Sequence, residues 1–219
     1  MARIAEDLLL LLLDNPEERP PLDRAPLGRV LAAGLILDLA FDCRVRPALS
    51  DEPLPAGHLV ALAGPVPADP AVRPAWTLLQ QQPITPADAI AAIRKHSEDD
   101  ILDQLLRTGQ IHQIQLTAHR LRRNHYRWPI KNRGRVAVAR SELLAILFEQ
   151  RRPNPAMAAV TCLLHGVHGL EAVLSLNNAG VQAVDERARE IAGGGWVDSS
   201  DSAQVNLSLT LDAVLPALG

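Results

Sequence analysis

Hydrophobic residues concentrate in the first quarter of the chain, where residues 30–41 are all small or apolar apart from Asp38. A helix that is apolar on every side belongs in a protein core or in a bilayer. About 20 apolar residues are needed to span a bilayer, and this run is shorter. We therefore predict that residues 28–45 contain a central core helix against which the rest of the chain packs.

A second apolar run lies at the start of the chain and predicts a helix over residues 4–13. Glu6 and Asp7 occupy its first turn, where the helix dipole favours acidic side chains. The six consecutive leucines that follow indicate a helix that is mostly buried. Because acidic residues flank these leucines and no small-residue cleavage site follows, we interpret the run as part of a protein that stays in the cytoplasm rather than as a signal peptide.

Capping residues predict two consecutive helices in the middle of the chain. Thr85 before Pro86 is typical of a helix start, and this helix reaches about residue 95. Ser97 is expected to cap the next helix, which Gly109 closes. Further helices are predicted over residues 141–150, 155–176 and 184–192 and, despite an alternating pattern at residues 205–211, in the tail up to residue 218.

Extended segments are few and short. Residues 47–86 hold nine of the 17 prolines and predict a long ordered loop with one small strand within His58–Ala63. Residues 110–117 alternate, and the segment that ends with Tyr126 and Trp128 is predicted to pair with them as a hairpin. A helix, a glycine and a hairpin in this order are typical of a winged-helix tip.

The composition favours a helical protein. Hydrophobic residues make up 47% of the chain but aromatic residues only 3%, so the core must consist of Leu, Ala, Val and Ile. We predict a mainly α protein: one helical domain over residues 1–219, around the central apolar helix, with small β-hairpins. Cys43 and Cys162 lie alone in apolar surroundings, so we expect buried reduced thiols and no zinc site.

Charge is distributed unevenly along the chain. Residues 104–141 contain no Asp or Glu, although the whole chain has 25 acids and a net charge of −3. This acid-free segment carries nine basic residues: Arg107, Arg120, Arg122, Arg123, Arg127, Lys131, Arg133, Arg135 and Arg140. Such asymmetry indicates an anionic partner.

Two function classes fit the acid-free segment. Tyr126 and Trp128 beside arginines suit the interface of an anionic membrane, and they equally suit stacking on nucleic-acid bases. The first hypothesis is a peripheral protein on a lipid surface. The alternative is a nucleic-acid-binding protein that uses residues 97–135 as a winged helix, with Arg122, Arg123 and Arg127 on phosphates.

Catalytic and metal-binding motifs are absent from the sequence. It has no nucleophile elbow, no glycine loop that could hold a phosphate and no paired-carboxylate motif. His165 and His168 share one face of a predicted helix, but two histidines in an apolar helix are more often structural than metal ligands. We expect neither an enzyme nor a metal or other cofactor.

Seven segments, in this order, resemble the Golgi phosphoprotein 3 family, including its bacterial members. They are IAEDLLLLLLD, GRVLAAGLILDLAFDCRV, VPADPAV, DDILDQLLRTGQI, RWPI, NPAMAAVTCLLHGVHGLEAVL and DERAREIA. The resemblance implies a single helical domain around a central bundle. In the eukaryotic members it also implies a peripheral membrane protein that binds phosphatidylinositol 4-phosphate and the cytosolic tails of resident enzymes.

The positions that the resemblance aligns with the eukaryotic lipid pocket are Asp23, Ala32, Pro155 and Ala158, and none has the expected residue type. An apolar hairpin used for membrane insertion and self-association aligns with residues 175–184. We therefore expect a non-enzymatic adaptor on the cytosolic face of a membrane. Its partner is expected to be a generic anionic lipid, a phosphoinositide headgroup or a cytosolic protein, and a homo-oligomer stays open.

Arginines close to these aligned positions suggest where an anion could bind. Arg24 and Arg29 lie near the first two positions, and Arg151 and Arg152 lie just before the other two. Planar guanidinium groups bind phosphate through two donors at once. We hypothesise that these four rebuild an anion site, and that Arg122, Arg123, Arg127 and Trp128 form the lipid-facing part of the acid-free segment.

Overall fold

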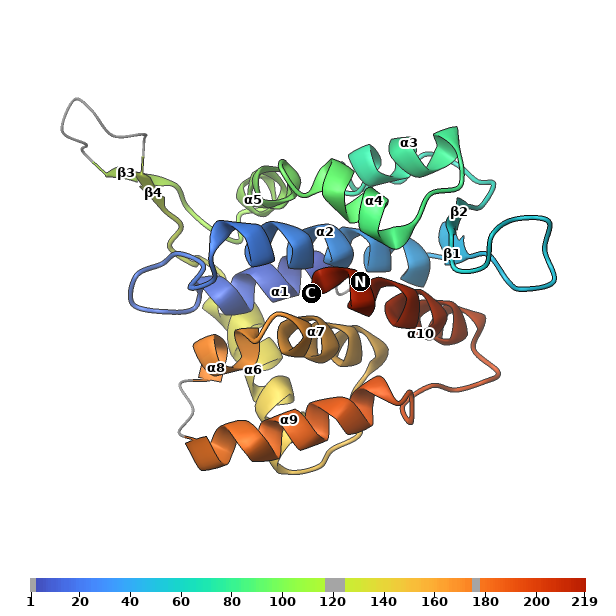
Figure 1. Ribbon diagram of the computed structural model, residues 1–219. Coiled ribbons are helices and arrows are strands. Elements are labelled where there is room, and N and C mark those ends of the chain that lie inside the picture. The colour runs from blue at the N-terminus through green and yellow to red at the C-terminus, as the bar shows by residue number, and fades with distance from the viewer. Residues whose placement is uncertain (1–2, 117–124, 175–177) are drawn as a thin grey trace.

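The computed structural model describes residues 3–116, 125–174 and 178–219, and it confirms a mainly α protein (Figure 1). The helices are α1 (Ile4–Leu13), α2 (Arg24–Phe41), α3 (Arg73–Gln81), α4 (Pro86–Ile93), α5 (Ser97–Arg107), α6 (Arg133–Phe148), α7 (Pro155–Gly166), α8 (Gly169–Leu174), α9 (Asn178–Ala192), α10 (Ser202–Val214) and the short 3-10 helix η1 (Leu215–Leu218).

The apolar helix α2 lies at the centre, as the sequence predicts. Every residue from Val30 to Ala40 is buried, and α1, α5, α7 and α10 pack against this helix. Helices α3, α4 and α5 lie on one side of α2, and α7 and α9 lie on the other (Figure 1). Helix α1 is buried along its whole length, including Glu6 and Asp7, so two apolar helices form the middle of the molecule.

Asp38, the polar residue inside the apolar run, caps α1 from the neighbouring helix. Its carboxylate accepts hydrogen bonds from the backbone N–H groups of Ile4 at 2.8 Å and Ala5 at 3.1 Å. Arg3, at the N-cap position of α1, makes no side-chain cap of its own. Burial raises the pKa of Asp38 to about 7, although the two N–H groups and Arg3 lower it. The first turn of α1 thus depends on a side chain of α2.

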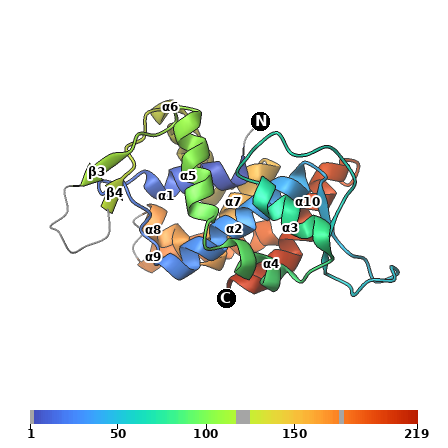
Figure 2. The ribbon, with the colours of Figure 1, turned by 90° about the horizontal axis from the view of Figure 1, so that it is seen from above.

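Two antiparallel hairpins complete the described fold. β1 (Val45–Pro47) pairs with β2 (Leu59–Ala61), and β3 (Ile114–Leu116) pairs with β4 (His125–Arg127). The β3–β4 hairpin follows α5 and projects from the helical body, most clearly in the view from above (Figure 2). Both small strand predictions are therefore confirmed.

Several helix boundaries differ from the predictions. α2 begins one turn earlier, at Arg24, and α9 begins at Asn178. α6 begins at Arg133, where the side chain of Asn132 accepts a hydrogen bond from Arg135 N. The predicted long loop contains α3, which buries Trp76 and its neighbours on one face. Only α3 was missed altogether, because the prolines around it favour a loop, whereas α2, α6 and α9 were predicted with starts that were too late.

The predicted helix over residues 155–176 is broken into α7 and α8. His168, between them, adopts a left-handed backbone conformation with φ 54°. The prediction of one uninterrupted helix over residues 155–176 was therefore wrong. In contrast, the tail forms α10 and η1 rather than a strand, because one face of this amphipathic segment packs on α2.

Capping and cysteine predictions had mixed outcomes. Thr85 caps α4, since its side chain accepts from Asp88 N at 3.1 Å. Ser97 begins α5 but does not cap it with its side chain. Cys162 is buried as predicted, and burial raises its pKa to about 12. The prediction for Cys43 was wrong: it is exposed, with φ 52°, because the chain leaves the core at the end of α2.

Candidate anion-binding site

A pocket of about 510 Å³ lies between the start of α2 and the α4–α5 connection. Arg24, Ala25 and Gly28 of α2 form one side. The other side consists of three consecutive basic residues, 94–96, with the sequence Arg-Lys-His. We call it the α2–α4 pocket.

Close backbone packing fixes the two sides of this pocket. A Cβ atom at Gly28 would lie only 2.8 Å from the carbonyl oxygen of Arg94, so glycine permits the approach. The buried hydroxyl of Ser97 donates towards the carbonyl oxygens of Gly28 and Arg94, at 3.3 Å each. The basic side chains therefore project from a backbone that is locked onto the central helix.

The basic side chains of the α2–α4 pocket form no ion pairs in the described structure. Arg24, Arg94 and Lys95 are exposed, and none of them forms an ion pair with any part of the chain that the structure describes. Burial raises the pKa of Glu98 in the adjacent first turn of α5, and the charge of Arg24 opposes that rise. The acidic residues in the first turn of α5 lie near the pocket but do not line it. They lower its positive potential and leave the pocket open.

The family comparison agrees with this fold. The family model described as Golgi phosphoprotein 3 (GPP34) matches residues 4–206, from the first residue of α1 into α10. The chain belongs to the Golgi phosphoprotein 3 family. The resemblance drawn from the order of segments is thus confirmed, and membership places the chain in an adaptor-type family. A search of curated protein sequences found no match.

The family's lipid-pocket positions, as aligned from the sequence, do not share one surface in this member. Ala32 and Ala158 are fully buried, whereas Asp23 and Pro155 are at the starts of α2 and α7. Residues 178–184, within the segment aligned with the family's apolar hairpin, lie in α9, and residues 175–177 are outside the described residues. The positions aligned with the family's lipid pocket therefore do not mark a common binding surface in this chain.

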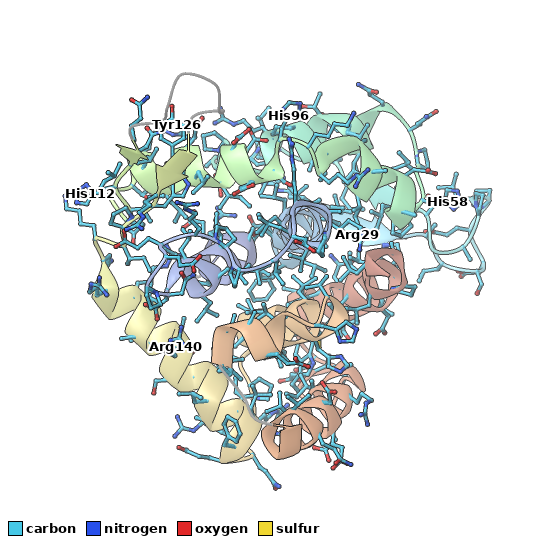
Figure 3. All side chains as sticks on the ribbon, turned by 60° about the vertical axis from the view of Figure 1, so that its left-hand side comes forward. Arg29, His58, His96, His112, Tyr126 and Arg140 are labelled. Carbon is cyan, nitrogen blue, oxygen red and sulfur yellow. The ribbon has the colours of Figure 1, made fainter. Side chains whose placement is uncertain are left out.

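The four arginines proposed near those positions are not brought together. Arg24 lines the α2–α4 pocket, whereas Arg29 donates from Nε to the carbonyl oxygen of Leu218 at 2.8 Å. Figure 3 shows the labels of His96 and Arg29 on different sides of the start of α2. Arg29 therefore ties α2 to η1.

The other two arginines lie beside α9. Arg152 donates to the carbonyl oxygen of Trp196 at 3.0 Å and lines a separate pocket of about 300 Å³. Arg151 is exposed and forms an ion pair with Glu149 at 3.3 Å. This pair shares no pocket with Arg24.

The β3–β4 hairpin holds the remaining candidates. Arg122 and Arg123 lie outside the described residues. Arg127 is on β4, and Trp128 directly after it is partly buried against the core. The rings of Tyr126 and Trp128 are 5.8 Å apart. The predicted order of helix, glycine and hairpin is present, but the contact of these residues with lipid or nucleic acid stays a prediction.

Two arginines of the acid-free segment are paired with distant acids. Arg135 contacts Glu6 at 2.7 Å and Asp7 at 2.8 Å, and Arg140 contacts Asp14 at 2.7 Å. Burial raises the pKa of Asp7, although the charge of Arg135 lowers it. These guanidinium groups join α6 to α1 and its end, so they are not available to an anionic partner.

Sequence reasoning missed the residues that complete the α2–α4 pocket, namely Arg94, Lys95 and His96. A signal was present, because three consecutive basic residues stand at the end of one predicted helix, directly before the next. Among the described residues, no group of three or more His, Cys, Asp or Glu could hold a metal ion. Likewise, none of the described helices is long and apolar enough to cross a membrane.

Proposed function

We propose that this family member is a non-enzymatic peripheral membrane adaptor whose α2–α4 pocket binds the phosphate of anionic lipid headgroups. One observation carries the proposal: Arg24, Arg94 and Lys95 surround one pocket and have no ion-pair partner in the described chain. Guanidinium and ammonium groups are the usual partners of phosphate in proteins.

The expected attachment is weak and electrostatic. Each basic residue near an anionic leaflet contributes about 1 kcal/mol. Three such residues then contribute on the order of 100-fold in membrane partitioning. Exposed charges are screened over about 8 Å at physiological ionic strength, so this binding must weaken as salt is added.

The β3–β4 hairpin offers a second possible contact with a bilayer. Ile114 is 48% exposed on β3, and Trp128 and Arg127 lie on or next to β4. Aromatic and basic side chains together suit the headgroup region of a bilayer. We include the hairpin in the proposal as a supporting contact.

The test is cosedimentation with vesicles of phosphatidylcholine alone, with phosphatidylglycerol added, or with phosphatidylinositol 4-phosphate added, at low and physiological salt. The variant Arg24→Gln/Arg94→Gln/Lys95→Gln removes three charges from the pocket. Arg151→Gln is the matched control, because Arg151 is exposed but lies at another site. We expect binding to anionic vesicles that the triple variant loses and the control keeps.

Two results would contradict this proposal. Binding that does not change with salt would exclude electrostatic attachment, and equal binding by the triple variant would exclude the α2–α4 pocket. A marked preference for phosphatidylinositol 4-phosphate would instead refine the headgroup. A parallel assay with duplex DNA tests the alternative, which requires a mobility shift at low salt.

A further inference from the structure

One face of α6 is apolar and exposed to solvent. Among the described residues, seven large hydrophobic side chains are exposed, and three of them, Val138, Leu144 and Phe148, belong to this helix. Their exposed fractions are 60%, 39% and 50%. Ala137 and Ser141 on the same helix are exposed as well. Single exposed apolar residues are normal on a protein surface, but a group of them on one helix indicates a contact surface.

Four exposed residues of α6 have the spacing of a helix–helix interface. Ala137, Ser141, Leu144 and Phe148 follow one another at intervals of four, three and four residues, so they form one stripe along the helix. The same spacing positions the interlocking side chains of paired helices. The opposite face of α6 is buried in the protein, so the stripe faces solvent. We call these four residues the α6 seam.

The α6 seam has a small half and a large half. Ala137 and Ser141 lie near its start, and Leu144 and Phe148 lie near its end. A parallel second copy would place large side chains opposite large ones and leave space between the small ones. An antiparallel copy, related by a two-fold axis between Ser141 and Leu144, places Phe148 opposite Ala137 and Leu144 opposite Ser141. Because close packing requires large side chains to meet small ones, the seam of one copy fits that of another in the antiparallel direction.

A groove of about 810 Å³ begins beside the small half of the seam. Its lining includes Gly134 and Val138 of α6 and residues 155–157 at the start of α7. In the antiparallel arrangement, the Phe148 ring of the second copy lies opposite Ala137 and therefore next to Gly134 and Val138. An aromatic side chain seated in a pocket of the facing chain is typical of the residues that dominate binding energy. Each copy thus supplies both a ring and a groove that can receive one.

We infer that the α6 seam is a homodimer interface, in which α6 pairs with α6 of a second copy in the antiparallel direction. Such an interface uses the same patch on both copies, as two-fold symmetry requires. The seam spans about three helical turns, so the interface is small, and the dimer should be weak and depend on concentration. The inference goes beyond the proposed function, because the seam shares no residue with the α2–α4 pocket.

The position of α6 favours a protein over a bilayer as the occupant of the seam. Arg140, on α6, lies on the opposite side of the central helices from His96 of the α2–α4 pocket (Figure 3). A flat bilayer bound at that pocket would not reach the seam. Arg133 and Glu149 are exposed beside the two ends of the seam, and such charges suit the polar rim of a protein interface.

The first experiment measures the mass of the full chain by sedimentation equilibrium, from micromolar to near-millimolar concentration. Phe148→Glu and Leu144→Glu each place a charge in the α6 seam, and both side chains are exposed, so the fold should be kept. Leu209→Glu is the matched control, because Leu209 is 43% exposed on α10. We expect the wild type and the control to dimerise, and the two seam variants to dimerise more weakly by about tenfold or more.

Crosslinking tests the direction of pairing without removing a large residue of the seam. In a Cys43→Ser background, which removes the exposed native thiol, Ser141→Cys or Ala137→Cys is treated with a short bismaleimide. In the antiparallel arrangement, the two copies of position 141 are about 5 Å apart along the helix axes, and those of position 137 are about 16 Å apart. We expect a crosslinked dimer with Ser141→Cys and little with Ala137→Cys. Equal crosslinking at both positions would indicate parallel helices and overturn the arrangement.

Three further results would contradict the inference. A wild type that stays monomeric at every concentration has no such interface. A dimer that both seam variants leave unchanged uses another surface. If the wild type is monomeric and Phe148→Glu lowers its binding to phosphatidylcholine–phosphatidylglycerol vesicles, the seam contacts a bilayer instead of a second copy.

Discussion

The basic side chains of α6 and those of the α2–α4 pocket carry the same charge but face different surroundings. Arg135 contacts two carboxylates of α1, and both carboxylates are nearly buried. Arg24, Arg94 and Lys95 are exposed and unpaired in the described structure. The number of charges in a segment therefore does not measure the charge available to a partner.

Removing a paired arginine should have the largest effect. Arg135→Ala leaves the carboxylates of Glu6 and Asp7 in the core without their counter-ion. Breaking a buried ion pair in this way costs about 3–5 kcal/mol. We expect urea denaturation to show a loss of this size in the free energy of unfolding. Arg133→Ala, an exposed neighbour on the same helix, is the control and should change it little.

Asp38 carries a buried carboxylate that is held by backbone N–H groups rather than by an arginine. Asp38→Ala removes the acceptor of two buried donors, each of which costs about 1–3 kcal/mol when left unpaired. We expect a loss of about 2–4 kcal/mol, with fraying of the first turn of α1 detected by hydrogen exchange. Unchanged exchange at Ile4 and Ala5 would contradict the capping role.

The pH dependence of Asp38 has a defined sign. Its pKa in the folded state is about 7, raised by burial and by Asp69 and lowered by Arg3, against an ordinary value of 3.8. The folded state therefore binds the proton more tightly than the unfolded state, so stability falls as pH rises from about 4 to about 7. Chemical denaturation across this range should show a steeper fall for wild type than for Asp38→Asn. Parallel curves would show that Asp38 does not titrate there.

Removing the unpaired charges should have the smallest effect on stability. Arg24→Gln/Arg94→Gln/Lys95→Gln breaks no ion pair in the described structure, and surface changes of this kind usually alter stability by less than about 0.5 kcal/mol. We expect a denaturation midpoint close to wild type, together with the loss of vesicle binding described above. A large drop in stability would mean that these side chains are structural rather than available to a ligand.

The sequence predicts the centre of the fold better than its edges. The apolar runs of α1 and α2 are long and strongly patterned, so burial on all sides follows directly from them. α3 and the first two turns of α6 were not predicted. Ala75, Trp76 and Leu79 of α3 do have helical spacing, but the prolines around them favour a loop. The start of α6 has few apolar residues, and tertiary contacts stabilise it as a helix. The break at His168 depends on one backbone angle that no residue pattern requires.

The site is less predictable than the fold for a related reason. Whether an arginine is available depends on its partner, and the partners of Arg135 are nearly 130 residues away. Nothing in the local pattern separates Arg135 from Arg94. The α2–α4 pocket likewise requires Gly28 to meet the carbonyl oxygen of Arg94, a contact between helices that periodicity does not reveal.

The position of α10 has a consequence for synthesis of the protein on the ribosome. This helix, one of the last elements in the chain, packs along α2, one of the first. Nascent α2 therefore leaves the exit tunnel with an apolar face that has no native cover until residues 202–214 follow it. During that interval the growing chain exposes the surface that chaperones recognise, and rare codons late in the message would lengthen the exposure.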